Sequence, residues 1–146
     1  MRVEGSIYIA AALENIWPFM VEPEKILQWY TTLQKFEFTG EQRSGVGAPF
    51  YCEERAGGRL MKLHFKVTEW VEHERLAFSM TSGNFVKKYD QKWVVAATES
   101  GSRFTLMEDV GLPYGIIGKI LGLFARRQSE KTVKEILANL KRLAEA

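Results

Sequence analysis

The spacing of apolar residues changes period twice along the chain and divides it into distinct regions. Polar and apolar side chains alternate over residues 3–9, which predicts a strand with one buried face. Over residues 10–20 the apolar side chains recur three or four positions apart, as on one face of a helix. Pro23 suits the first turn of a second short helix that continues to Trp29. The chain is therefore expected to open with one strand and two short helices.

A period of two then runs from Thr31 to Val110 and predicts a series of strands. Turns rich in glycine separate these strands, and Ala56-Gly57-Gly58 has the composition of a hairpin turn. The connections are short, which is typical of an antiparallel meander. The strands are expected at residues 36–38, 49–55, 59–70, 76–80, 85–97 and 103–110.

The last region, from Pro113 to Ala146, predicts one long helix. Its apolar side chains keep a helical period, which nearly lapses over the polar residues 126–134. Such a helix cannot bury its apolar stripe alone, so we expect the strands before it to wrap around it. The apolar positions are Ile116, Ile117, Ile120, Leu121, Phe124, Val133, Ile136, Leu137, Leu140 and Leu143.

Length, charge and cysteine content narrow the class of protein. The chain has 146 residues, of which 46% are hydrophobic and 26% charged, and we expect a single globular domain over residues 1–146. A net charge of +2 without a long basic block argues against a nucleic-acid partner. The single cysteine, Cys52, excludes an internal disulfide. The sequence shows no signal peptide and no stretch long enough to span a bilayer, so we expect a cytoplasmic protein without stable membrane insertion.

Short motifs across nearly the whole chain resemble the START-like superfamily, also known as SRPBCC or Bet v 1-like. The end of the first predicted strand resembles that family's strand exit, although Ala11 stands where proline is usual. The other similar stretches are structural motifs of turns and hairpins, so they indicate the fold more strongly than the function. The matching residues are 7–11 and 14–17, Pro23-Glu24-Lys25 with Trp29, Gly45-Val46-Gly47-Ala48, Val67-Thr68-Glu69-Trp70 and Glu74-Arg75-Leu76-Ala77-Phe78.

This resemblance implies an α+β helix-grip fold of order β-α-α-β6-α. In that fold a curved seven-stranded antiparallel sheet wraps around the long C-terminal helix, and the two short helices close one end of the groove. The most similar branch is the polyketide cyclase/dehydratase type. A hydrophobic cavity between sheet and helix is implied as well, and such a cavity is the default site for an apolar small molecule.

Strand alternation predicts which polar side chains face this cavity. The odd positions of residues 85–97 place Lys87, Tyr89 and Gln91 on one face, and the even positions of residues 103–110 include Glu108. These side chains would not face the cavity if they lay at a strand end in solvent, or if a bulge shifted the alternation by one residue. The catalytic residues remain unknown, with Glu108 and Tyr89 as candidates. The residues expected to line the cavity are Trp17, Trp29, Leu63, Phe65, Phe78, Lys87, Tyr89, Gln91, Trp93, Leu106, Glu108, Ile117, Leu121 and Phe124.

An inward Glu108 is the best acid/base candidate, because burial raises the pKa of a carboxyl towards neutral pH. Lys87 could instead neutralise Glu108 in an ion pair, which would be a structural role. Other chemistry has little support: His64 falls on the outward side of its strand and His73 lies in a turn. Neither has a partner carboxylate at the spacing of metal ligands, so we expect no metal site and no cofactor. No serine stands in a G-x-S-x-G motif, so a hydrolase triad is unsupported.

Three functions stay open on the sequence alone. The first is binding or transport of a lipid-, isoprenoid- or polyketide-like molecule in the cavity. The second is a polyketide cyclase or dehydratase, which needs two polar groups that converge in the cavity, such as Glu108 and Tyr89. The third is a protein-interaction or stress-regulator module, which an apolar surface along residues 114–124 would favour. Either a monomer or a weak homodimer is compatible with the sequence.

Overall fold

Seven strands and three helices form the part of the chain that a computed structural model describes, which is residues 1–112 and 116–146, with only the backbone for residues 116–122. All neighbouring strands are antiparallel, and their order in the sheet is β1-β7-β6-β5-β4-β3-β2. The predicted element order, β-α-α-β6-α, and the helix-grip architecture are confirmed. The strands are β1 (Arg2–Ile9), β2 (Leu33–Phe38), β3 (Pro49–Ala56), β4 (Arg59–Val71), β5 (Arg75–Gly83), β6 (Lys88–Ala97) and β7 (Ser102–Gly111).

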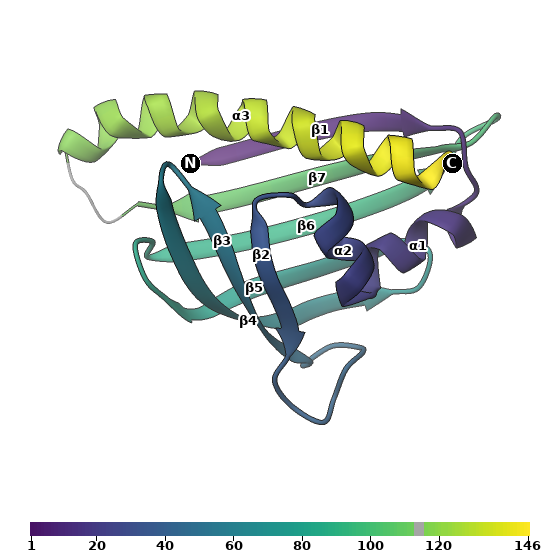
Figure 1. Cartoon of the computed structure of the whole chain (residues 1–146), viewed down its shortest axis with the longest axis horizontal. Coiled ribbons are helices and arrows are strands. Elements are labelled where there is room, and N and C mark those ends of the chain that lie inside the picture. Colours follow the sequence, from purple (N-terminus) through teal and green to yellow (C-terminus); the bar gives the residue numbers. More distant parts are fainter. Residues whose placement is uncertain (113–115) are drawn as a thin grey trace.

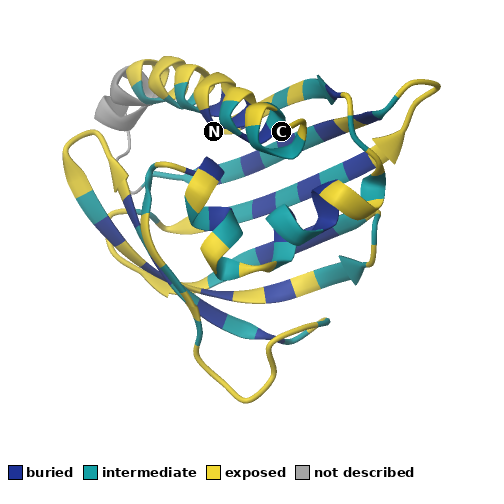
Figure 2. Cartoon of the chain, turned by 45° about the vertical axis from the view of Figure 1, so that its right-hand side comes forward, coloured by how far each residue is buried: buried dark blue, intermediate teal, exposed yellow. Residues whose placement is uncertain are grey.

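The sheet curls around one side of the long helix α3 (Ile116–Ala144), as Figure 1 shows. The consecutive strands β1 and β2 occupy opposite edges of the sheet, and the helices α1 (Leu13–Val21) and α2 (Pro23–Trp29) connect them. Along the central strands buried residues alternate with more exposed ones, so each strand turns one face to the helices (Figure 2). The period of two in the sequence thus defines the inner surface of the sheet.

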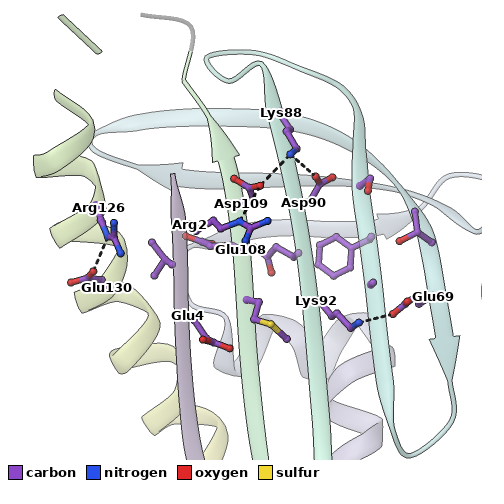
Figure 3. Close-up of a pocket in the computed structure, with 17 residues that line it drawn as sticks. Arg2, Glu4, Glu69, Lys88, Asp90, Lys92, Glu108, Asp109, Arg126 and Glu130 are labelled. Atoms are coloured by element: carbon purple, nitrogen blue, oxygen red, sulfur yellow. Dashed lines mark hydrogen bonds and ion pairs between the residues drawn. The ribbon is translucent and has the colours of Figure 1, made fainter. Parts of the chain in front are cut away.

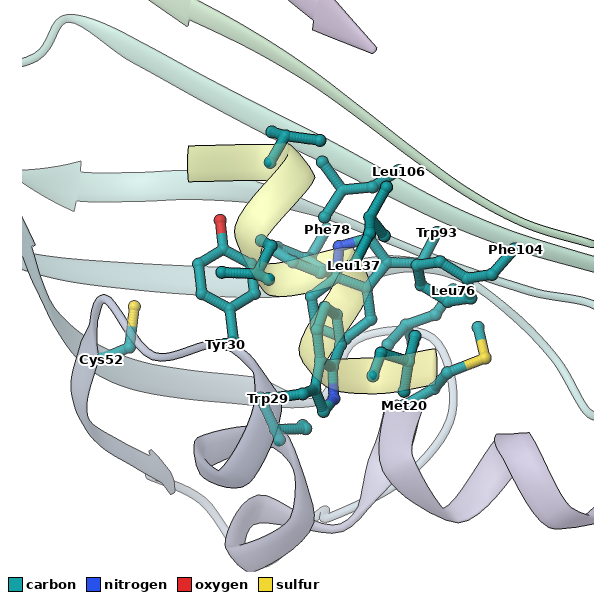
Figure 4. Close-up of a cluster of buried hydrophobic side chains, with 14 of the residues drawn as sticks. Met20, Trp29, Tyr30, Cys52, Leu76, Phe78, Trp93, Phe104, Leu106 and Leu137 are labelled. Carbon is teal, nitrogen blue, oxygen red and sulfur yellow. The ribbon is translucent and has the colours of Figure 1, made fainter. Parts of the chain in front are cut away.

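Aromatic rings fill the closed end of the space between sheet and helices (Figure 4). Trp29 at the end of α2 lies edge-on to Trp93, with 5.1 Å between ring centroids, and to Phe104, at 5.7 Å. Its indole Nε1 donates a hydrogen bond to the carbonyl of Phe19 at 2.8 Å, which satisfies the polar atom of a fully buried ring. These contacts attach α1 and α2 to the sheet and close this end of the groove.

The sequence places the start of β6 too early, and the prediction that Lys87 faces the interior is wrong. Phe85 has φ 65°, in the left-handed region, so the chain turns at this point instead of extending. Strand β6 begins only at Lys88, and Lys87 lies before it with an exposed side chain. The alternation inferred for this stretch holds from Tyr89 onwards but fails before the turn.

The prediction that Phe124 lines the interior is also wrong, because its side chain is 65% exposed. Phe124 precedes the buried Val133 by nine residues, about two and a half turns of helix, and therefore lies on the opposite side of α3. The side chains of Ile117 and Leu121 lie outside the described residues, as does the predicted helix start at Pro113. Among the residues that the structure describes, no helix has both the length and the apolar composition to cross a membrane.

Helix α3 packs tightly against the sheet at Gly5 in β1. A Cβ atom at this position would lie 2.4 Å from Cγ1 of Val133 and 3.1 Å from Cδ1 of Leu137. Both distances are shorter than an ordinary van der Waals contact, so the helix rests directly on the backbone of β1. A glycine is therefore needed at residue 5 for α3 to pack at its present depth.

Replacing Gly5 with alanine should lower the free energy of unfolding by about 1–3 kcal/mol, because the added methyl group overpacks this contact. Urea denaturation of the wild type and Gly5→Ala measures the difference. The control is the same substitution in a Val133→Ala background, where room exists for the methyl group and the cost should be smaller. Equal costs in the two backgrounds would show that the contact with Val133 does not limit the packing of α3.

Candidate functional site

A cavity of about 200 Å³ lies between α3 and the end of the sheet that carries the turn between β3 and β4. One wall is formed by the part of α3 before its buried stripe, where short and polar side chains such as Gln128, Ser129 and Thr132 line the space. The opposite wall includes the apolar side chains of Met1, Met61, Val86, Val110 and Leu112, and the exposed residues Arg55, Ala56 and Gly57 form its rim.

Two buried carboxyl groups, Glu54 of β3 and Glu108 of β7, lie in the polar part of this cavity. The hydroxyl of Tyr89, on β6, joins them: it donates to Oε1 of Glu54 at 2.9 Å and lies 3.4 Å from Oε2 of Glu108. The hydroxyl of Thr32 donates to the other oxygen of Glu54 at 3.1 Å. Glu54 is thus the better hydrogen-bonded carboxyl of the two.

A second layer of hydrogen bonds orients this cluster. Trp93 Nε1 donates to Oε1 of Gln91 at 2.8 Å, which directs the amide nitrogen of Gln91 towards the tyrosines. Gln91 Nε2 donates to the hydroxyl of Tyr30 at 2.7 Å and to that of Tyr89 at 2.9 Å, and it lies 3.4 Å from Oε2 of Glu108. Most polar groups of the cluster are therefore held by buried side-chain partners.

Burial raises the pKa of Glu108 to about 8, and the nearby charge of Glu54 adds to the rise while the hydrogen bond of Tyr89 opposes it. Burial also raises the pKa of Glu54, against the hydrogen bonds from Tyr89, Thr32 and Tyr30. Glu108 is therefore mostly protonated at pH 7. The pKa values of Tyr30 and Tyr89 are raised well above their ordinary range by burial, so both hydroxyls keep their protons.

No lysine, arginine or histidine among the described residues forms an ion pair with Glu54 or Glu108. Lys87, the partner that the sequence suggested for Glu108, is exposed instead. The described part of the chain also holds no group of three acidic, histidine or cysteine side chains placed to bind a metal ion. The two buried carboxyls are thus stabilised by hydrogen bonds and by protonation, and not by an ion pair with a described basic side chain.

A larger hollow, of about 880 Å³, lies on the other face of the sheet (Figure 3). Its charged side chains neutralise one another: Lys88 lies 3.1 Å from Asp109 and 3.4 Å from Asp90, and Lys92 lies 3.2 Å from Glu69. This hollow is the more open of the two, and its ion pairs are only partly buried. The smaller cavity is the better candidate site because it is less open and is bordered by two buried carboxyls that form no ion pair with a described basic side chain.

The residues predicted to line a cavity divide among three places. Tyr89 and Glu108 border the 200 Å³ cavity. Trp17 lies outside it and packs edge-on against Trp70, with 5.7 Å between ring centroids. A void of only about 20 Å³ is bordered by Phe65, Phe78, Gln91 and Trp93, and Trp29, Leu63 and Leu106 are fully buried in the core.

Sequence reasoning missed Glu54, Tyr30 and Thr32. A signal for Glu54 was present, because Phe50, Cys52 and Glu54 alternate along β3 and share its buried face. Tyr30 and Thr32 lie in the connection after α2, outside the period of any strand or helix. No pattern in the sequence predicts their orientation.

Residues 1–145, nearly the whole chain, match the family described as polyketide cyclase/dehydrase and lipid transport. The chain belongs to this family. No curated protein matches it.

Solved structures with the same fold are distant in sequence. A protein from Thermus thermophilus shares 20% identity, with 99% of this chain and 97% of that chain covered and a TM-score of 0.84. A START superfamily protein from Mycobacterium smegmatis shares 14% identity, covers 99% and 97%, and has a TM-score of 0.81. An aromatase/cyclase from a Streptomyces species shares 14% identity, covers 99% and 90%, and has a TM-score of 0.73. At these identities the likeness shows the fold alone.

This member of the polyketide cyclase/dehydrase family should lose stability as the pH rises from about 5 to 8.5. An unfolded glutamate titrates near pH 4.3, whereas Glu108 in the folded protein titrates near 8. Between these values the folded state binds more protons than the unfolded state, so the free energy of unfolding falls with increasing pH.

Urea denaturation of Glu108→Gln should show a smaller fall in the free energy of unfolding between pH 5 and 8.5. At pH 8.5 this variant should be more stable than the wild type. Glu53→Gln, next to Glu54 but on the outer face, is the control and should retain the wild-type slope. A wild-type slope in Glu108→Gln would contradict the assignment.

Replacing Glu54 with glutamine should lower the pKa of Glu108 below its value of about 8, because a neighbouring negative charge is removed. Carbon-13 NMR titration of labelled glutamate carboxyls measures this directly. Glu53→Gln is again the matched control and should leave the titration of Glu108 in place. A Glu108 that titrates identically in Glu54→Gln and wild type would mean that the two carboxyls are not coupled.

Proposed function

We propose that the protein binds a small apolar or amphipathic molecule in the cavity between α3 and the sheet. The observation that supports this proposal is a partly open cavity of about 200 Å³ with apolar side chains in one wall and a buried polar end. An apolar wall favours the body of such a ligand, and a few converging polar groups orient it. The family, whose description includes lipid transport, agrees with a role of this kind.

The size of the cavity limits the ligand. Drug-sized ligands occupy pockets of roughly 300–1,000 Å³, which is more than the 200 Å³ found here. A ligand of one or two rings, or a short chain, is therefore the best fit to the protein in this conformation. A longer lipid-like molecule requires the walls to separate or part of the ligand to remain outside.

A cyclase or dehydratase is the second candidate, and the Glu54–Tyr89–Glu108 cluster favours it. Elimination of water from a β-hydroxy carbonyl compound needs a base to take a proton from carbon and an acid to protonate the departing hydroxyl. Glu108, whose raised pKa favours the protonated form, would supply the acid, and Glu54, which accepts hydrogen bonds from Tyr89 and Thr32, would supply the base. The comparison with an aromatase/cyclase supports this candidate only through the shared fold.

Replacing Ser129 with tryptophan should abolish binding of a neutral aromatic probe, because Ser129 borders the cavity and an indole would fill it. Isothermal titration calorimetry with 1-naphthalenemethanol measures the binding. Lys131→Trp is the control: it introduces the same side chain two residues further along α3, at an exposed position outside the cavity. The control should bind the probe as the wild type does. Equal binding by Ser129→Trp and wild type would place the ligand elsewhere and contradict the proposed function.

A further inference from the structure

We propose that the cavity selects ligands whose polar end is a protonated amine, that this amine binds Oε1 of Glu108, and that ligands ending in a carboxylate or phosphate are rejected. The inference rests on the proposed function, since it names the chemical class of the molecule bound in the same cavity. It is carried by one carboxyl oxygen without a partner among the described residues, and by the acidic and uncharged groups that surround it.

Glu108 presents an unused acceptor to the cavity. The side chain is only 8% exposed and borders the cavity, yet within the described part of the chain its Oε1 accepts no hydrogen bond. Its other oxygen, Oε2, has only two long contacts of 3.4 Å, to Tyr89 and Gln91. A buried carboxyl left this way gains from any donor that a ligand brings.

The neighbouring donors are already committed to other acceptors. The two amide hydrogens of Gln91 have closer acceptors in the hydroxyls of Tyr30, at 2.7 Å, and Tyr89, at 2.9 Å. The single hydroxyl hydrogen of Tyr89 goes to Glu54, at 2.9 Å, in preference to Glu108. The hydroxyl of Tyr30 is likewise engaged with Glu54, so the donors named here all have acceptors other than Oε1 of Glu108.

The described groups that face Glu108 are acidic or uncharged. Strand β3 contributes Glu54, strand β6 contributes Tyr89 and Gln91, and the loop after α2 contributes Tyr30. The described residues of α3 contribute the uncharged polar side chains of Gln128, Ser129 and Thr132, and from β1 Val3 is paired with Glu108.

The described cations near the cavity form no ion pair with Glu54 or Glu108. Arg55 borders the cavity, but it is exposed and alternates with the buried Glu54 along β3, so its side chain points away from the carboxyls. The amino group of Met1 donates to the carbonyl of Val110 and lies 3.8 Å from Asp109. Lys88 pairs with Asp90 and Asp109 on the outer face. Within the part of the chain that the structure describes, a ligand cation would therefore be the first positive charge to reach the two carboxyls. Because such a contact is shielded from water, it would be a strong charge-assisted hydrogen bond.

The same arrangement disfavours anions. A carboxylate or phosphate placed against Glu54 and Glu108 would add a third acidic group beside two carboxyls with which no described basic side chain forms an ion pair. Like charges at short range in a buried site are costly, so these ligands are excluded by repulsion as much as by missing donors. The cavity thus separates amines from acids that have the same apolar body.

Three probes with one naphthalene body test the inference by titration calorimetry: 1-naphthylmethylamine, 1-naphthalenemethanol and 1-naphthoate. The amine should bind about 10- to 100-fold more tightly than the alcohol, the gain expected of a charge-assisted hydrogen bond. The naphthoate should not bind measurably. Because the amine displaces the proton of Glu108, its affinity should rise between pH 6 and 8, and titrations in buffers of different ionisation enthalpy should show nearly one proton released per amine at pH 7.

Glu108→Gln should lower the affinity for the amine to about that for the alcohol and should abolish the proton release. Glu53→Gln, on the outer face, should keep the preference for the amine and the proton release. If the alcohol binds and the amine shows no preference, or if naphthoate binds as tightly as the amine, the inference is wrong although the proposed function stands. If none of the three probes binds, the proposed function is wrong and the inference fails with it.

Discussion

The packing of α3 into the curled sheet is the contact on which the rest of the structure depends. The helix rests on Gly5 of β1, and its buried stripe of Val133, Ile136, Leu137 and Leu140 completes the core. The residues before this stripe are polar or short, and there the helix forms the wall of a cavity instead of filling the space. One helix therefore acts as core at one end and as the lining of a site at the other, and the change in its sequence from apolar to polar marks the boundary.

The two buried carboxyls reduce the free energy of unfolding to which the packing of α3 contributes. Removing a carboxyl from water is unfavourable, and the raised pKa of Glu108 reports that cost as a preference for the neutral form. An apolar pair of similar size would fill the same space without any requirement for hydrogen bonds. A fold that keeps such a pair beside a cavity departs from the rule that buried groups should be apolar or fully satisfied. Departures of this kind concentrate where proteins bind or react.

The sequence predicted the fold well but the site only in part. The fold follows from patterns that are local in the sequence, whereas the site depends on contacts between distant segments. Period-two alternation is a local property, so the inner faces of β4, β6 and β7 follow from it, and Tyr89 and Glu108 with them. The left-handed Phe85, which exposes Lys87, has no comparable local signal, because glycine usually occupies such a position. Phe124 was misplaced because the apolar stripe of α3 was read as one continuous face, although the polar interval interrupts it. The hydrogen bond between Tyr89 and Glu54 depends on the curvature of the whole sheet, which cannot be inferred from the periodicity of single strands.

The hydroxyl of Tyr89 bridges strands that are not neighbours. In the order β7, β6, β5, β4, β3, the strands carrying Glu108 and Glu54 are four positions apart, which would be roughly 19 Å in a flat sheet at about 4.8 Å per strand. Curvature alone brings both carboxyls to one hydroxyl. Any flattening of the sheet pulls Glu54 away from Tyr89 and weakens the repulsion between the acids, so the curvature of the sheet and the number of protons on this cluster are mechanically coupled.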